Sequence, residues 1–131
     1  IGAGLQVADV VALGEQVYDE RLAGRIWDGT RRLAEQHRER GDPVWLVTGA
    51  PVELAEIVAR RLGLSGALGT ISEVEDGAWT GRLVGEILHG KAKADAGSSM
   101  PGSCKCWVNF GRKPVGRRLP RKRPCSSRPA A

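Results

Sequence analysis

The spacing of apolar residues in the first part of the chain predicts helices. Between residues 5 and 26, apolar side chains recur mostly at helical intervals, and acidic and amide side chains fall largely between them. This spacing is typical of one or two amphipathic helices. A further helical pattern covers residues 29–40, with Asp28 or Thr30 as its expected N-cap. Gly41 follows as the expected stop.

A short apolar run at residues 44–47 predicts a strand. It reads VWLV, which includes three β-favouring side chains, and glycines lie on both sides of it. Its length and continuous apolar character favour a buried strand of a parallel sheet. Pro51 fits the first turn of the next helix, where its missing N–H costs no hydrogen bond. That helix is expected to continue to about Leu62 and to end at Gly63.

The pattern then changes to a hairpin and one more helix. Residues 69–85 alternate partly around Asp76-Gly77, and this dipeptide is a strong hairpin signal because both positions accept a positive φ. Residues 89–96 (HGKAKADA) predict the start of a helix. The order helix, strand, helix, hairpin, helix is that of a partial α/β unit.

The charge of the chain divides it in two. Residues 1–100 contain 11 basic and 15 acidic residues, whereas residues 101–131 contain nine basic residues and no acid. All three cysteines and five of the seven prolines also follow residue 100. The net charge of +5 is therefore the average of an acidic body and a basic tail. No apolar stretch reaches the roughly 18 residues that predict a membrane span, and no secretory signal is visible.

The tail permits several interpretations. It has no helical or strand period, so we expect residues 98–131 to be disordered. Its cations, concentrated in residues 112–123, could bind nucleic acid without sequence preference. An out-of-frame translation of a G+C-rich gene would produce the same composition. The spacing of Cys104, Cys106 and Cys125 matches zinc sites poorly, so free thiols are expected.

The stretch VTGAP, which follows the predicted strand, is the first candidate for chemistry. The hydroxyl of Thr48 and the backbone N–H of Gly49 lie where a strand leads into a helix. Such a turn can hold a phosphate oxygen. An ordinary strand-to-helix loop, with Thr48 near the helix cap, would have the same sequence.

The stretch HGKAKADA is the second candidate. Lys91 and Lys93 lie at the opening of a predicted helix, and a lysine there can pair with a carboxylate and a phosphate together. The alternative is that both are solvated surface charges. His89 is expected to be a surface or capping residue.

Three stretches together carry a family resemblance. VWLVTGAPVELAEIVARRLGLSGALGT, EVEDGAWTGRL and LHGKAKADA, in this order, resemble the haloacid dehalogenase superfamily, subclass IB, which includes phosphoserine-phosphatase-like hydrolases. The resemblance covers about residues 5–96. It implies an α/β fold with a partial Rossmann-like three-layer core at residues 27–97. It also implies that residues 1–26 are the remnant of a helical cap.

The resemblance assigns roles to three residues. The family hydrolyses small phosphate esters with an aspartate nucleophile and Mg²⁺. Thr48 matches the hydroxyl that binds the phosphoryl group, and Gly49 matches the residue whose N–H assists it. Lys93 matches the catalytic lysine that stabilises the nucleophile and the phosphate charge. We prefer Lys93 to Lys91 because the family pattern reads Gly-x-x-Lys.

Two expected motifs are missing from the chain. No Asp-x-Asp segment, the source of the nucleophile and general acid, precedes Val10. The region after Gly97 contains no acidic pair for Mg²⁺, and Asp95 lies too early. We therefore expect a truncated, inactive fragment of a cytoplasmic enzyme that has no metal ligands of its own and does not bind Mg²⁺.

Overall fold

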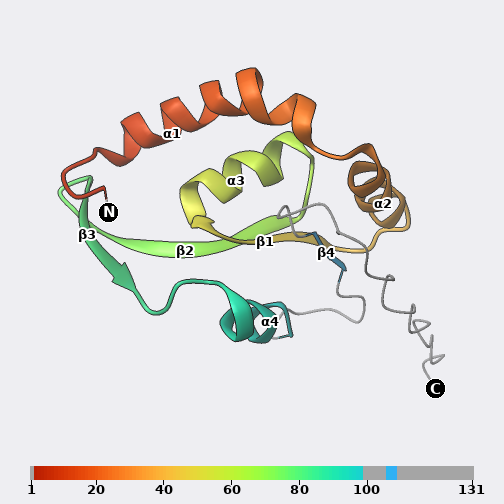
Figure 1. The fold of residues 1–131 in the computed structure, drawn as a ribbon. Coiled ribbons are helices and arrows are strands. Elements are labelled where there is room, and N and C mark those ends of the chain that lie inside the picture. Colours follow the sequence, from red (N-terminus) through yellow and green to blue (C-terminus); the bar gives the residue numbers. More distant parts are fainter. Residues whose placement is uncertain (1, 99–105, 109–131) are drawn as a thin grey trace.

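The structure, a computed structural model, describes residues 2–98 and 106–108, which form a sheet with helices on both faces (Figure 1). The strands are β1 (Val44–Pro51), β2 (Gly66–Glu75), β3 (Ala78–Val84) and β4 (Cys106–Val108). They lie in the order β3-β2-β1-β4. β1 runs parallel to both of its neighbours, whereas β3 is antiparallel to β2.

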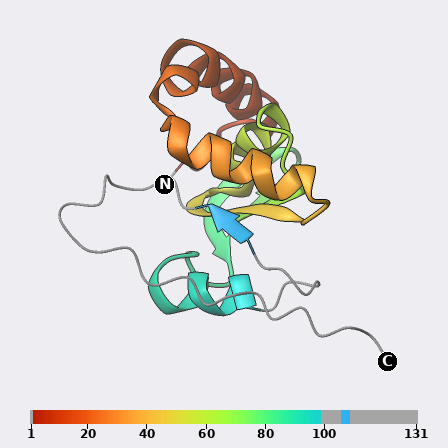
Figure 2. The same cartoon turned by 90° about the vertical axis from the view of Figure 1, so that its right-hand side faces the viewer.

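The helices form two layers around this sheet. They are α1 (Val7–Val17), α2 (Asp28–Glu39), α3 (Val52–Arg61) and α4 (Gly90–Ser98). α3 packs on the sheet with α1 outside it, and α4 lies on the opposite side (Figures 1 and 2). This arrangement confirms the expected α/β fold with a partial Rossmann-like core. None of the described helices is long and apolar enough to cross a lipid bilayer.

The predicted strand at residues 44–47 is confirmed as a central, buried element. Val44 and Leu46 are almost fully buried and pack toward Ala34 of α2 and Ala55 of α3. Val47, which points to the other face by strand alternation, is equally buried. Both faces of β1 are therefore covered, which explains why the sequence is continuously apolar rather than alternating.

The predicted hairpin turn is also confirmed. Asp76 has a φ of 50° and Gly77 a φ of 79°, and the flanking residues Glu75 and Ala78 pair across the two strands. Two consecutive positive φ values match the right-handed twist of the strands, and Asp-Gly tolerates them with little strain.

The expected starts of α2 and α3 are each wrong by at least one residue. Trp27, not Asp28 or Thr30, is the N-cap residue of α2, and no side-chain cap is formed. Its carbonyl accepts hydrogen bonds from the N–H groups of Thr30 and Arg31 at 3.0 and 3.1 Å. Asp28 instead lies in the first turn, where the helix dipole favours a carboxylate. Pro51 precedes α3, because its extended backbone still belongs to β1.

The N-terminal segment packs against α3 through apolar contacts. Tyr18 and Ile26 form a buried cluster with Ile57 of α3. Gly14 allows a close approach, since a Cβ there would lie 2.6 Å from a methyl carbon of Leu54. The identity of residues 1–26 as a cap remnant, and the boundary at residue 97, stay predictions.

Ion pairs also join α1 to α3. Glu15 of α1 binds Arg60 and Arg61 of α3, and Arg61 also binds Asp19 at 3.0 Å. The guanidinium of Arg61 lies 5.4 Å from the ring centre of Tyr18. Hydrogen bonding from Arg61, together with the positive charge of both arginines, lowers the pKa of the Glu15 carboxyl. Because these side chains are partly or largely exposed, their ion pairs contribute little to the stability of the fold.

The expectation of a disordered tail at residues 98–131 is wrong at Ser98, which ends α4, and at Cys106–Val108. Cys106–Val108 form β4, which pairs in parallel with β1. Trp and Val favour strands, and β1 would otherwise present an open edge of unpaired N–H and C=O groups. Residues 99–105 and 109–131 lie outside the described part of the chain. Cys104, Cys125 and the basic run 112–123 are among them, so the zinc and nucleic-acid alternatives stay untested.

Candidate functional site

Thr48 and Gly49 lie at the carboxyl end of β1, as predicted. Thr48 is half-buried and Gly49 is exposed. The Thr48 hydroxyl oxygen accepts a hydrogen bond from the N–H of Ala50 at 3.2 Å. A hydroxyl that accepts one hydrogen bond can still donate its own hydrogen to another acceptor. The position and the bonding of Thr48 are therefore compatible with an oxyanion as a further partner.

The two lysines of α4 differ in their surroundings. The Lys91 side chain is 90% exposed and binds Asp95 at 2.8 Å, the ordinary pairing of charges one helical turn apart. Lys93 is half-buried, and desolvation lowers the pKa of its ammonium group. A partly desolvated cation interacts more strongly with an anion than an exposed cation does.

The segment that leads into α4 lies directly against the carboxyl end of β1. A Cβ on Gly49 would lie 3.4 Å from the carbonyl oxygen of Leu88 and 3.9 Å from the Cβ of His89. Lys93 follows one turn into α4, which packs against β1. The structure thus brings the first candidate segment and the segment leading into the second together, although 40 residues separate them in sequence. The role of each residue stays a prediction.

Sequence reasoning missed Thr70, which joins these two segments. Thr70 lies in β2, is only 6% exposed, and is the one buried polar residue of the described core. Its hydroxyl donates to the carbonyl of Gly49 at 2.9 Å and accepts from the N–H of Leu88 at 3.1 Å. The only sequence signal was a Gly-Thr pair inside a strand, since a glycine there often marks a close backbone approach.

Gly69 shows how close this approach is. A Cβ on Gly69 would lie 2.7 Å from the Ala50 carbonyl oxygen and 2.7 Å from the Cα of Val52. Both of these are backbone atoms, so a side chain could fit only if the junction of β1 and α3 moved. Gly69 therefore lets β2 pack closely against the end of β1 that carries Thr48.

Replacing Gly69 with alanine is expected to lower the free energy of unfolding by about 1–3 kcal/mol, as overpacking in a core does. Gly24→Ala is the matched control, because no atom lies within 4 Å of a Cβ there. That control should change stability by less than about 0.5 kcal/mol. Urea denaturation measures both, and equal stabilities of the two variants would contradict the close approach.

The expectation that this chain does not bind Mg²⁺ stays a prediction. Within residues 2–98 and 106–108, no three His, Cys, Asp or Glu side chains gather closely enough to hold a metal ion. Asp95, two residues after Lys93, is exposed and paired with Lys91. No step that uses Mg²⁺ is assigned to these residues.

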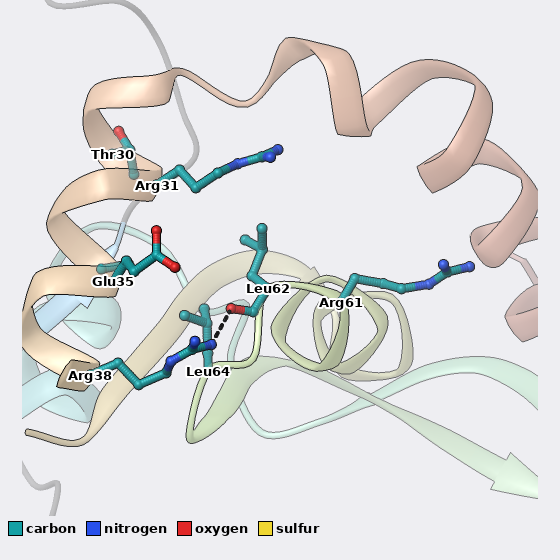
Figure 3. Close-up of a pocket in the computed structure, with 8 residues that line it drawn as sticks. Thr30, Arg31, Glu35, Arg38, Arg61, Leu62 and Leu64 are labelled. Carbon is teal, nitrogen blue, oxygen red and sulfur yellow. Dashed lines mark hydrogen bonds between the residues drawn. The ribbon is translucent and has the colours of Figure 1, made fainter. Parts of the chain in front are cut away.

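A pocket of about 150 Å³ lies between α2 and the end of α3, and none of its lining residues is a candidate for phosphate chemistry (Figure 3). Its arginines have structural partners. Arg38 donates to the carbonyl of Leu62, as Figure 3 shows, and Arg31 donates to the carbonyl of Ala23. Arg61 binds the carboxylates of α1 and the following turn. The three arginines of the pocket therefore hold neighbouring segments of the chain together.

Comparison with known proteins agrees with the resemblance. A family model described as haloacid dehalogenase-like hydrolase matches residues 1–102. The chain is 60% identical over 97 residues to phosphoserine phosphatase SerB1 of Mycobacterium tuberculosis. It is 32% identical over 90 residues to a phosphoserine phosphatase of Streptomyces coelicolor. It is 34% identical over 77 residues to one of Archaeoglobus fulgidus.

These matches cover much of this chain but little of the relatives. They include 74%, 68% and 57% of the chain, respectively. They include 32% of the M. tuberculosis protein and 22% of each of the other two. The chain therefore spans about a third or less of the length of the relatives it matches.

Proposed function

Because the chain belongs to the haloacid dehalogenase-like hydrolases, we propose that it carries the phosphoryl-binding part of a phosphatase that acts on small phosphorylated substrates. The observation that carries this proposal is the contact of the Thr48-Gly49 end of β1 with the segment that leads into α4. This contact lies at the carboxyl end of β1. Ligands of open α/β sheets bind beyond that end of the strands.

Each candidate residue supplies a different interaction to the phosphoryl group. Thr48 donates its hydroxyl hydrogen and Gly49 its backbone N–H to phosphoryl oxygens. Lys93 supplies a positive charge that balances the anion. Lys93 is preferred to Lys91 for this role, because the Lys91 side chain is 90% exposed and the family pattern reads Gly-x-x-Lys.

The names of the relatives support a substrate class. Three of them are named phosphoserine phosphatases, and one of these is 60% identical over the matched region. We therefore propose a phosphomonoester of the phosphoserine type as the substrate of the complete catalytic unit. The residues described here contribute binding and charge compensation, and the aspartate nucleophile and Mg²⁺ that the family resemblance implies are not assigned to them.

Titration with inorganic phosphate tests this proposal in the 131-residue chain. Amide NMR spectra should show saturable shifts at Thr48 and Gly49 and at the residues from Leu88 to Lys93. Lys93→Met should weaken binding roughly tenfold, because it removes a charge-assisted hydrogen bond. Thr48→Val, which keeps the shape but removes the hydroxyl, should weaken it by a similar factor.

Lys91→Met is the matched control for charge. It removes the same charge two residues away. If phosphate binds at Lys93 itself, this variant should change the phosphate affinity by less than about twofold. Equal effects of Lys91→Met and Lys93→Met would show that phosphate binds only through the general charge of α4, and the proposal would fail.

A further inference from the structure

Thr70 forms a bridge between the two halves of the proposed phosphate site, and it is not among the residues that the family resemblance assigns. Its single hydroxyl contacts the carboxyl end of β1 and the segment before α4 at the same time. We infer that Thr70 is a positioning residue that sets the spacing between Thr48-Gly49 and the helix that carries Lys93. This inference rests on the proposed function.

The first contact fixes the orientation of one peptide group. The carbonyl of Gly49 accepts the hydroxyl hydrogen of Thr70 at 2.9 Å. The N–H of the same peptide, which belongs to Ala50, donates to the Thr48 hydroxyl at 3.2 Å. The peptide is therefore held at both ends by threonines on adjacent strands. Rotation of this peptide would break the hydrogen bond from the Ala50 N–H to the Thr48 hydroxyl.

The second contact fixes the start of α4. The N–H of Leu88 donates to the Thr70 hydroxyl oxygen at 3.1 Å, two residues before α4 begins. Gly90, the first residue of α4, has a φ of 56°, so the chain turns sharply at this point. A fixed Leu88 therefore determines where α4 begins, and through it where Lys93 lies relative to the carboxyl end of β1.

The chemistry of this position requires a hydroxyl group. One atom must donate to a carbonyl and accept from an amide within a site that is only 6% exposed. Serine provides the same pair of hydrogen bonds. Valine has nearly the same shape but provides neither, and cysteine provides weak versions of both. These three substitutions separate the hydrogen bonds from the packing of the side chain.

The chain contains a matched control on the neighbouring strand. The Thr80 hydroxyl also makes two hydrogen bonds, since it donates to the Glu73 carboxylate and accepts from the N–H of Arg82. Thr80 lies on β3 within the hairpin, and both of its bonds stay within that hairpin. Thr80→Val therefore removes the same number of hydrogen bonds without affecting the bridge.

The experiment measures inorganic phosphate affinity and amide hydrogen exchange in the 131-residue chain. Thr70→Val should speed exchange of the Leu88 N–H roughly tenfold and weaken phosphate binding by a similar factor. Thr70→Ser should restore both to about the original values, and Thr70→Cys should lie between them. Thr80→Val should leave both unchanged. If Thr70→Val does not fold, the serine and cysteine variants still give the graded comparison.

The outcomes distinguish this inference from the proposed function. If Lys93→Met weakens phosphate binding but the valine and cysteine variants bind as the original chain does, the proposed function holds and the positioning role of Thr70 is wrong. If the original chain does not bind phosphate, the proposed function fails. Hydrogen exchange then tests the Thr70 bridge separately. Unchanged protection of the Leu88 N–H in Thr70→Val and Thr70→Cys would overturn the bridge, whereas a graded loss of protection would support it.

Discussion

The purified 131-residue chain is expected to hydrolyse neither phosphoserine nor p-nitrophenyl phosphate above the rate in buffer with Mg²⁺. Hydrolysis through an aspartyl-phosphate needs a carboxylate in line with phosphorus and an acid to protonate the leaving oxygen. The chain contains no Asp-x-Asp segment, the motif that would supply both in this family. Thr48, Gly49 and Lys93 can bind and polarise a phosphoryl group, but they cannot form that intermediate.

The expected effect is large, because loss of a covalent nucleophile costs several orders of magnitude in rate. The measurement is release of inorganic phosphate, with and without Mg²⁺, from a chain whose fold has been checked by NMR. Hydrolysis that disappears in Thr48→Ala or Lys93→Ala would contradict the prediction. An exposed acid such as Asp9 or Asp28 would then be the nucleophile, and substitution of each by asparagine would identify it.

A chimera with the M. tuberculosis relative is expected to depend on the same residues. The matched 97 residues of that protein are replaced with those of this chain, and the identity of 60% favours a compatible core. If the phosphoryl-binding roles are right, Thr48→Val should lower kcat/KM roughly 100-fold to 1000-fold, as removal of one oxyanion donor does. Lys93→Met should cause a loss of at least similar size, because it removes a full charge.

Lys91→Met in the same chimera is the control, and its kcat/KM should stay within about twofold. A chimera that hydrolyses phosphoserine equally well with and without the Thr48 hydroxyl would show that this hydroxyl does not bind the phosphoryl group. Equal losses from the two lysine substitutions would show that the position of Lys93 has no special role.

Local patterns in the sequence were enough to predict several elements. The apolar run at residues 44–47 predicted a buried strand, and the Asp76-Gly77 dipeptide predicted a hairpin turn. Both features depend on interactions within a few residues, such as alternation, burial and the φ values that glycine and aspartate tolerate. The helix starts were less accurate, because either a backbone carbonyl or a side chain can serve at a cap and the sequence does not distinguish them.

Features that depend on distant segments required the tertiary structure. Nothing in the letters GT at residues 69 and 70 showed that the Thr70 hydroxyl would meet Gly49 and Leu88. The pairing of Cys106–Val108 with β1 was missed for the same reason, since strand pairing depends on which edge is open in the folded sheet.

The sequence by itself determined the elements, the family resemblance and the residue types available for phosphate binding. Thr48, Gly49 and Lys93 were identified by their place in short motifs, which need no knowledge of the fold. Only the tertiary structure decided that Lys93 is partly desolvated while Lys91 is exposed, and that a buried hydroxyl joins the two motifs. The physical reason is that desolvation and bridging hydrogen bonds depend on the packing of several segments around one atom, whereas a motif records only neighbours along the chain.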